Sequence, residues 1–405
     1  MLSIYRGLSK EIYIISFSRF INALGNFVFP LFTFYLTEKL HMEKEMVGLM
    51  VTLAITAYVP GMMISSFISD FWGRKKVYLF FHGMAGLIMI LCGFLNQYEW
   101  APYLVILSAV FNGGARPSLS SMVADLAKSE ERKAAFSLEY LCNNLGFSIG
   151  PLIGTHLYYW GFVDLIFFLN GFFIFTAVIS IALFTRETLK TKEEMAKIQE
   201  DSLEKYEEGG FFEVLLKRPN LIFFSLTMIL LNFCYAQTSF TLNIQMQTIF
   251  QVESSRLYGI LMAINGATVV LFTPTITKIG LRVHPLNNIA LAGIFYAIGM
   301  GAFSIINGFP LYILATVIWT IGEILMVVDM DNYISQNTPI NFRSRFLGSI
   351  QVFSGLGYGI GPYVSGKLLN LGITTSQLWI SIFFIGITAA GILKILTLRE
   401  KSKCK

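Results

Sequence analysis

The sequence predicts an all-α integral membrane protein with twelve transmembrane helices in two pseudo-symmetric six-helix bundles. Of its 405 residues, 55% are hydrophobic and only 14% are charged, and the mean hydropathy is +0.63. Soluble domains carry roughly 25% charged residues. Apolar runs near the length of about 20 residues that a bilayer requires follow one another with brief polar breaks. An internal repeat divides the chain into two similar halves.

Twelve apolar runs bounded by charged residues give the expected spans. The first run is too long for a signal-peptide core and has no small-residue cleavage site behind it, so we expect it to be the first helix. The runs lie at residues 12–36, 47–68, 77–95, 102–124, 135–159, 164–184, 221–244, 257–277, 287–306, 310–334, 346–369 and 375–397. They leave no room for a sizeable soluble domain.

The basic residues predict how these helices are oriented, because lysine and arginine gather in cytoplasmic loops. With a cytoplasmic amino terminus, 24 of the 30 lysines and arginines fall in inner segments, four in outer segments and two inside spans. We therefore expect a multi-pass protein of the plasma membrane with both termini in the cytoplasm. The short exterior loops favour a bacterial membrane.

One long hydrophilic stretch, residues 185–220, separates the two halves. It is rich in Lys and Glu, with pairs four residues apart such as Glu193 and Lys197, and Gly209 and Gly210 lie towards its end. This pattern predicts an amphipathic cytoplasmic helix. The predicted domains are an N-terminal six-helix bundle at residues 1–184, the cytoplasmic linker at 185–220 and a C-terminal six-helix bundle at 221–405.

A shift of 211 residues lays the segment LGFSIGP at 145–151 over LGYGIGP at 356–362, and Arg132 over Arg343. The fifth and eleventh spans are therefore equivalent. This is expected of two parallel bundles related by an axis along the membrane normal.

Several function classes are excluded by what the sequence lacks. The four cysteines show neither CxxC nor His-rich spacing, so we expect no metal site and no disulfide. There is no nucleotide-binding loop and no nucleophile elbow, so we do not expect an enzyme. Loop topology explains the net charge of +5, so nucleic acid is not an expected partner.

The turn between spans two and three carries the charged motif DFWGRKK at 70–76. Asp70 can cap the free amides of a helix start, and Gly73 permits a tight turn. Arg74 and Lys75 can bind lipid phosphate or a carboxylate of the other half. A loop that is merely positive inside would explain the cations alone. We expect an inner gate here, joined by Asp125 at the inner end of span four.

This motif resembles that of the major facilitator superfamily, whose second-to-third loop carries a pattern of Gly, Asp, Arg, Gly and basic residues. Two positions differ, since Ser66 stands where the family glycine is usual and Phe71 where its first arginine is usual. The resemblance implies a gate built on charge pairs, and the two departures put its full charge network in doubt.

Span five carries a stripe of small residues, Gly146, Gly150 and Gly154, with Pro151 among them. Such a stripe allows close helix packing, and packing alone would explain it. Within the superfamily, a Gly-Pro-x-x-Gly signature in span five resembles the motif of antiporters. That resemblance favours export by exchange.

Two acidic residues lie at membrane depth, where each costs about 2.5–3.5 kcal/mol on insertion scales. Glu139 lies in span five on the face of Asn143 and Gly146, and Glu323 lies near the middle of span ten. A desolvated carboxylate in a cavity can exchange a proton for a cationic substrate. Either acid can instead be structural and paired with a buried arginine.

Two arginines also fall inside spans. Arg116 in span four needs a partner, and both a proton relay and a structural pair with Glu139 or Asp125 remain open. Arg19, beside Asn22 in span one, either contacts an anionic substrate group or extends to the inner surface, and we favour the second.

Span seven is polar for a membrane helix. Tyr235, Gln237 and Asn243 suit a wet, aromatic-lined substrate cavity, to which we also assign Arg19, Asn22 and Asn143. Interhelical hydrogen bonding would explain the polar residues of span seven equally well.

Over nearly the whole chain, the resemblance is closest to drug/proton antiporters of the LmrP type. In those proteins an Asp and an Arg-Lys pair precede a carboxylate near the start of span five. Here Asp125 and the pair Arg132-Lys133 precede Glu139 in the same way. They also carry a Gly-Glu pair in span ten, matched by Gly322-Glu323. The resemblance implies a multidrug or amphiphile exporter driven by proton entry, with Glu139 and Glu323 as proton and cation sites.

We therefore expect a secondary active transporter that exports lipophilic, positively charged drugs or amphiphiles by alternating access. It would need no cofactor, because the proton gradient supplies the energy. Its partners would be small-molecule substrates, protons and membrane lipids, and we expect a monomer. A dedicated exporter or flippase for an endogenous metabolite, metallophore or lipid remains open, because Arg19 and Arg116 suit an anionic ligand. The lack of a soluble signalling domain disfavours a non-transporting sensor.

Overall fold

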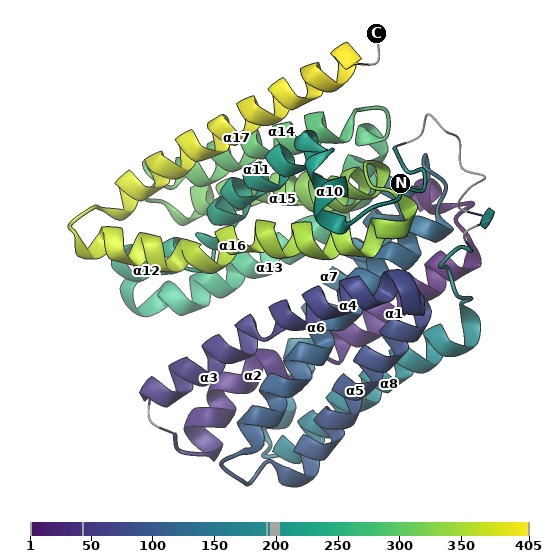
Figure 1. Ribbon diagram of the computed structural model, residues 1–405. Coiled ribbons are helices and arrows are strands. Elements are labelled where there is room, and N and C mark those ends of the chain that lie inside the picture. The colour runs from purple at the N-terminus through teal and green to yellow at the C-terminus, as the bar shows by residue number, and fades with distance from the viewer. Residues whose placement is uncertain (1, 43, 192, 195–202, 404–405) are drawn as a thin grey trace. The chain divides into compact units, whose positions relative to one another are not determined.

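The computed structural model describes residues 2–42, 44–191, 193–194 and 203–403. Helices make up 83% of the chain, and this described part contains no β-strand. Figure 1 shows the helices with their labels. The all-helical architecture confirms the predicted fold class.

The structure contains two compact units, each of which is described by itself. The N-unit comprises Tyr5–Tyr206 together with Thr338–Ser349, and the C-unit comprises Glu207–Asn337, the chain from Ile350 onward and the first residues of the chain, up to Ile4. The expected linker at 185–220 therefore contributes to both units. Its residues 192 and 195–202, including Lys197 of the expected helical pair, lie outside the described residues.

The N-unit is built from long helices that pack in a few close pairs. Helix α5 packs on α6 and α8, α1 packs on α7 and α8, and α4 packs on α6. The elements are α1 (Lys10–Leu24), α2 (Val28–Phe34), a π-helical turn (Tyr35–Lys39), α3 (Lys44–Thr56), α4 (Tyr58–Trp72), α5 (Arg74–Leu95), α6 (Ala101–Leu126), α7 (Arg132–Tyr159), α8 (Val163–Phe184) and the 3₁₀ turn η4 (Ile340–Phe342), with a further 3₁₀ turn η1 (Leu2–Tyr5) at the start of the chain.

The C-unit repeats this arrangement. Helix α14 packs on α15 and α17, α13 packs on α15, and α11 packs on α17. The elements are α10 (Phe211–Leu216), α11 (Pro219–Ala236), α12 (Thr241–Phe250), the 3₁₀ turn η3 (Gln251–Glu253), α13 (Ser254–Gly280), α14 (Pro285–Ala302), α15 (Phe309–Gln336), α16 (Arg343–Asn370) and α17 (Thr375–Lys403). Helix α16 belongs to both units, because its first residues lie in the N-unit and the rest lie in the C-unit.

The internal repeat is visible in the helix bounds themselves. Helix α7 (Arg132–Tyr159) shifted by 211 residues coincides with α16 (Arg343–Asn370). The same shift lays the starts of α5, α6 and α8 over those of α14, α15 and α17 within a few residues. The two halves are thus copies of one helical plan, as the matching sequence segments predict.

The helices of spans one, two and seven contain local breaks that the sequence did not predict. The first breaks between Leu24 and Val28, the second at Ala57, and the seventh between Ala236 and Thr241. Polar side chains satisfy the backbone near two of these breaks, because the Asn170 amide donates to the Gly25 carbonyl and the Gln237 amide donates to the Phe233 carbonyl. A helix break at membrane depth needs such partners, since no water is available to the freed backbone groups.

Within the described part of the chain, eight helical segments are long and apolar enough to cross a membrane by length and composition. They account for eight of the twelve expected spans. The other four expected spans, at 12–36, 102–124, 135–159 and 346–369, are helical, and the first of them is divided between two shorter helices. For those four, membrane crossing remains a prediction from the sequence.

The outer surface of the helices is strongly apolar. Large side chains such as Leu183, Leu271 and Phe384 are more than 60% exposed. Tyr159 and Trp160, at the end of α7, are also exposed, and such aromatic residues favour the membrane interface. This surface suits lipid and not water.

Candidate functional site

A buried charge cluster lies in the N-unit where α4, α6, α7 and the start of α16 meet. Its ion pairs and hydrogen bonds link acids and arginines from four separate stretches of the chain. The charge cluster consists of Asp70, Arg74, Asp125, Arg132, Glu204, Arg343 and Arg345.

Asp70 caps the first turn of α16. Its Oδ1 accepts the backbone N–H of Ser344 at 3.1 Å, and its Oδ2 accepts that of Arg345 at 3.2 Å. The Arg345 Nε also lies 3.1 Å from Oδ2. A carboxylate at a helix amino end satisfies the free amides and opposes the positive end of the helix dipole. Asp70 thus anchors α16 to the end of α4.

Arg74 is fully buried and joins three elements. Its Nε lies 2.6 Å from Asp125 Oδ2 at the end of α6, and its Nη1 lies 3.6 Å from Asp70 Oδ1. The same guanidinium donates to Ser344 Oγ at 3.0 Å and to the Ile340 carbonyl at 2.9 Å. Among the residues expected at the inner gate, Asp70, Arg74 and Asp125 are therefore in direct contact.

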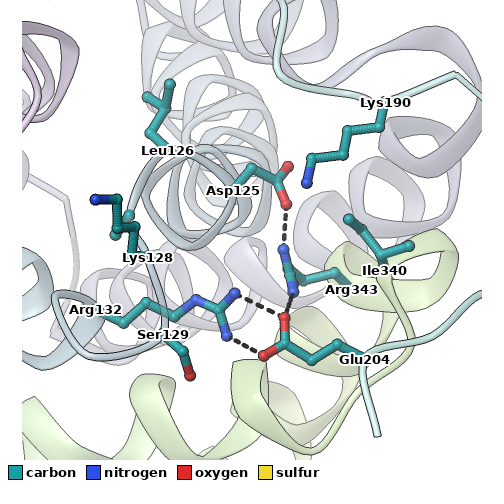
Figure 2. Close-up of a pocket in the computed structure, with 10 residues that line it drawn as sticks. Asp125, Leu126, Lys128, Ser129, Arg132, Lys190, Glu204, Ile340 and Arg343 are labelled. Atoms are coloured by element: carbon teal, nitrogen blue, oxygen red, sulfur yellow. Dashed lines mark hydrogen bonds and ion pairs between the residues drawn. The ribbon is translucent and has the colours of Figure 1, made fainter. Parts of the chain in front are cut away.

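Glu204, from the linker, connects Arg132 to Arg343 within the charge cluster (Figure 2). Its two carboxylate oxygens accept from Arg132 Nη1 and Nη2 at 2.6 and 2.7 Å, and Oε2 also accepts from Arg343 Nη2. Arg343 Nη1 reaches Asp125. Burial alone would raise the pKa of Glu204, but the hydrogen bonds and charges of Arg132 and Arg343 outweigh it and lower that pKa.

Gly73 and Lys75 hold the turn before α5. Gly73 has φ +112°, which favours glycine, and an added Cβ would lie 2.5 Å from Glu187 Oε2. The Glu187 carboxylate in turn accepts the backbone N–H of Arg74 at 2.8 Å. Lys75 Nζ donates to the carbonyls of Ala182 and Thr185 at the end of α8. Lys75 therefore caps a helix, and this contact replaces the lipid phosphate or carboxylate expected for it.

The two departures from the family motif have counterparts in the structure. A Cβ on Gly348 would lie 2.5 Å from the Cβ of Ser66, so a glycine on α16 leaves the room that a glycine at 66 would give. The Arg345 guanidinium lies 4.7 Å from the ring centroid of Phe71, so a cation–π contact occupies the place of the missing arginine. Ser66 and Phe71 thus both lie against the start of α16.

Glu139 is bound to Arg19. The Arg19 Nε lies 3.0 Å from Glu139 Oε1, and their side chains are 18% and 10% exposed. Arg19 was expected to extend to the inner surface, but a buried carboxylate within reach offers a stronger partner. Glu139 therefore has its negative charge compensated in this structure.

The residues around this pair are polar. Asn22 Oδ1 and His82 Nε2 are 3.1 Å apart, and His82 also contacts Asn112. Asn143 lies one turn beyond Glu139 on α7 and is half-buried. No role was expected for His82, because a lone histidine in an apolar run gives no spacing signal. Arg116 is exposed. Of the two acids considered as its partners, Glu139 is bound by Arg19, and Asp125 is bound by Arg74 and Arg343.

Glu323 lies in the C-unit among neutral donors and aromatic rings. The Tyr235 hydroxyl donates to its Oε1 at 3.3 Å, and Asn265 Nδ2 donates to its Oε2 at 2.8 Å. The ring of Tyr235 lies 6.2 Å from that of Trp319 and 5.9 Å from that of Tyr358. Glu323 itself is 6% exposed. A carboxylate walled by aromatic rings can hold a lipophilic cation.

The polar residues of span seven divide between two roles. Tyr235 serves Glu323, whereas Gln237 is fully buried and bonds Thr241 and the Phe233 carbonyl at the helix break. The Asn243 Oδ1 accepts from Gln247 at 3.2 Å. Gln237 and Asn243, both expected in the substrate cavity, therefore make contacts within their own segment.

The small-residue stripe of α7 packs against α1. An added Cβ would lie 2.5 Å from the Leu24 carbonyl at Gly150 and 3.1 Å from the Phe27 ring at Gly154. In the other half, Gly361 is the repeat equivalent of Gly150, and its Cβ would lie 2.8 Å from that of Ala236. Gly146, Gly150 and Gly154, with Pro151 between them, thus serve close packing in this structure.

Three residues of the charge cluster escaped the sequence reasoning as functional sites. Arg343 and Arg345 were read as ordinary inner-loop cations, and Glu204 as one of many linker acids. The repeat supplied a signal for Arg343, since it aligns with Arg132. No pattern in the sequence distinguishes Glu204 from its acidic neighbours.

An all-helical chain with an apolar exterior, an internal repeat and acids buried among its helices has the architecture of a membrane transporter. The family model described as Major Facilitator Superfamily matches residues 15–362. The chain belongs to this superfamily and is a membrane-spanning transporter.

Several relatives match nearly the whole chain. The chain is 25% identical over 370 residues to the uncharacterized MFS-type transporter YqjV of Bacillus subtilis, covering 90% of this chain and 87% of that protein. It is 22% identical over 381 residues to a Na⁺, Li⁺, K⁺/H⁺ antiporter of Planococcus maritimus, covering 85% of each. The solved structure of the human organic anion transporter MFSD10 matches with a TM-score of 0.71 at 13% identity, over 96% of this chain and 99% of that one. This last likeness shows the fold alone.

Proposed function

We propose that the protein is a proton-coupled antiporter that exports lipophilic, positively charged drugs or amphiphiles by alternating access. It would act at the plasma membrane of a bacterium, with both termini in the cytoplasm, as a monomer among membrane lipids. The proton gradient would be its only energy source, with no cofactor.

The observation that carries this proposal is the setting of Glu323. Its carboxylate accepts from the hydroxyl of Tyr235 and the amide of Asn265, and the ring of Tyr235 lies 6.2 Å from that of Trp319. A carboxyl that accepts from such neutral donors can exchange its proton, whereas a bound cation favours the ionised form. Proton and cation would therefore compete for one group.

This competition gives the exchange cycle. From the outside, Glu323 takes a proton and releases the cation. On the inside it loses the proton to the cytoplasm and binds the next cation. Glu139 would support the cycle as a second acid, with Arg19 as the cation that replaces its proton. Alternating access would carry both steps through one site.

The test is efflux of tetraphenylphosphonium, a lipophilic cation, from cells, or its uptake into inverted vesicles, in each case energised by a pH gradient. The native protein should move the cation uphill while the gradient lasts, and Glu139→Gln and Glu323→Gln should not. Uphill movement that persists after the gradient is dissipated would contradict the proposed coupling.

A second candidate function is exchange of alkali cations for protons. The similarity to the antiporter of Planococcus maritimus favours this alternative. Uptake of Na⁺, Li⁺ or K⁺ into inverted vesicles that depends on Glu323, with no movement of tetraphenylphosphonium, would establish it.

A dedicated exporter of an anionic metabolite, metallophore or lipid would depend on Arg19 and Arg116. Arg19 is engaged by Glu139, and Arg116 is exposed. Replacing both arginines by alanine in a folded protein without loss of transport would count against this alternative.

A further inference from the structure

One linker carboxylate joins two arginines that occupy the same position in the two halves of the repeat. Arg132 begins α7, and Arg343, 211 residues later, begins α16. Glu204 accepts both terminal nitrogens of Arg132, at 2.6 and 2.7 Å, and one terminal nitrogen of Arg343. Such a two-pronged arginine contact fixes orientation as well as distance.

The backbone of the linker is held at the same point. The Ile340 N–H donates to the Glu204 carbonyl at 3.0 Å, directly before the turn that leads into α16. The side chain and the main chain of Glu204 therefore both form hydrogen bonds with one short segment, Ile340 to Arg343. A chance surface ion pair would lack this second attachment.

The charges around Glu204 make its carboxylate necessary for this arrangement. The side chains of Arg132 and Arg343 are 7% and 1% exposed, and the burial and the neighbouring charge of Arg343 lower the pKa of Arg132. Asp125 is already shared between Arg74 and Arg343. Without Glu204, two buried guanidinium groups would repel each other across the start of α16.

A cavity of about 380 Å³ borders these side chains (Figure 2). Besides Glu204, Arg132 and Arg343, its lining includes Lys128 and Lys190, whose side chains are exposed. A carboxylate leaving the two arginines would enter a space lined by cations. Glu204 can therefore leave the two arginines and pair with solvated lysines without crossing an apolar core.

We propose that Glu204 is a gating residue that positions the start of α16, so that the linker keeps the inner gate closed until its contacts with Arg132 and Arg343 release. This proposal rests on the proposed alternating-access function. Glu204 touches no substrate and acts through the two arginines. Because α16 continues from the N-unit into the C-unit, release at Arg343 frees the end of a helix that is common to both.

The test measures access to a buried position beside α16. Ser118 is fully buried, and it follows Pro117, which lies 3.3 Å from where a Cβ on Gly348 would stand. Ser118→Cys serves as the reporter, labelled with a water-soluble maleimide on inverted vesicles. The background carries serine in place of the native cysteines, Cys92, Cys142, Cys234 and Cys404.

Glu204→Gln, which keeps the shape and removes the charge, should raise the labelling rate of the reporter about tenfold by shifting the population towards the open gate. Glu208→Gln, an exposed acid of the same linker, is the matched control and should leave the rate unchanged. Equal rates for the two variants would overturn the proposal.

If Glu204→Gln lowers stability, a double-mutant cycle can still test whether Glu204 acts through Arg132. Arg132→Gln should raise labelling in the same direction, and combining it with Glu204→Gln should add less than the sum of the two single effects. Additive effects in folded variants would show that Glu204 does not act through Arg132, and would also overturn the proposal.

This readout is independent of substrate and proton. If Glu204→Gln changes labelling but the protein moves no tetraphenylphosphonium, the gating role of Glu204 is supported and the proposed function is wrong. If the protein exports the cation but Glu204→Gln and Glu208→Gln label identically, the proposed function is supported and the gating role is wrong.

Discussion

The buried acids Glu139 and Glu323 lie in different halves of the molecule and are bound by different groups. Glu139 in the N-unit lies 3.0 Å from the guanidinium of Arg19, whereas Glu323 in the C-unit accepts from a hydroxyl and an amide. The first carboxylate has its charge compensated by an arginine. The second accepts hydrogen bonds from two neutral groups, which suits a carboxyl that exchanges a proton for a ligand.

The repeat makes this difference more informative. Shifted by 211 residues, Glu139 corresponds to Ile350, Arg19 to Leu230, and Glu323 to Asn112. The helices are copies, but the ionisable groups are not. A symmetric scaffold therefore carries an asymmetric pair of sites, one suited to a structural or switching role and one suited to exchange.

The largest expected effect concerns transport at Glu323. Glu323→Gln should lower gradient-driven efflux of tetraphenylphosphonium by about 10³-fold, because a group that carries both proton and cation is removed. Glu253→Gln, an exposed acid of the same unit, should keep native efflux. Initial efflux rates at matched expression provide the measurement, and native rates in Glu323→Gln would break the comparison.

The second prediction separates the acids by stability. Glu139→Gln leaves Arg19 without its carboxylate at 3.0 Å, so unfolding should become easier by about 3 kcal/mol. The double variant Arg19→Gln with Glu139→Gln should recover most of that loss, because neither charge is then buried alone. Thermal midpoints in detergent provide the measurement. Equal losses in the single and double variants would show that the pair is not a unit.

The third prediction compares equivalent glycines of the two halves. At Gly150 an added methyl would lie 2.5 Å from a backbone carbonyl of α1, and at Gly361 it would lie 2.8 Å from the side chain of Ala236. Gly150→Ala should therefore cost about 2 kcal/mol and Gly361→Ala less, since the nearest contact at Gly361 is longer and its second neighbour, at 3.0 Å, is the end of the flexible Gln237 side chain. Thermal midpoints in the reverse order would contradict this packing account.

The fourth prediction concerns the neutral donor at Glu323. Tyr235→Phe keeps the ring beside Trp319 and removes the hydroxyl that donates to Oε1, so the KM for the cation should change by about tenfold. Tyr258→Phe is the matched control, because its hydroxyl donates to the Thr238 carbonyl. A KM change of the same size in both variants would count against a specific role for Tyr235.

The smallest expected effect is the weak pH response of the ion pairs of Glu204. Arg132 and Arg343 lower the pKa of Glu204, so its stabilising contribution is fully present above the unfolded value of about 4.3 and is lost as pH falls through the lower folded value. The ratio of reporter labelling in Glu204→Gln to that in Glu208→Gln should therefore differ little between pH 5 and pH 8, because the pH dependence of the thiol–maleimide reaction is common to both variants. A steep change in this ratio across that range would contradict the lowered pKa of Glu204.

The sequence predicted the parts of the fold that depend on periodicity and composition. Hydropathy located the helices, and the repeat of LGFSIGP by LGYGIGP matched α7 to α16 residue for residue. The helix breaks after Leu24 and Ala236 were missed, because the runs stay apolar through them. Distant side chains, such as the Asn170 amide on the Gly25 carbonyl, make such breaks tolerable, and hydropathy does not report them.

The candidate site was predictable only where a local pattern carries it. Asp70 and Gly73 stand in a recognisable turn, and Glu323 is conspicuous in an apolar run. The partner of Glu139 is 120 positions away, so spacing along one helix gave no hint of Arg19. Glu204 lies in a stretch where acids are common, and only three-dimensional contact with Arg132 distinguishes it.

The central claim is that a lipophilic cation and a proton compete for Glu323. The most direct measurement is proton release when tetraphenylphosphonium is added to the purified protein in weakly buffered detergent solution. The account predicts that the native protein releases protons on binding and that Glu323→Gln releases none. Binding of the cation without proton release, or undiminished release from Glu323→Gln, would contradict it.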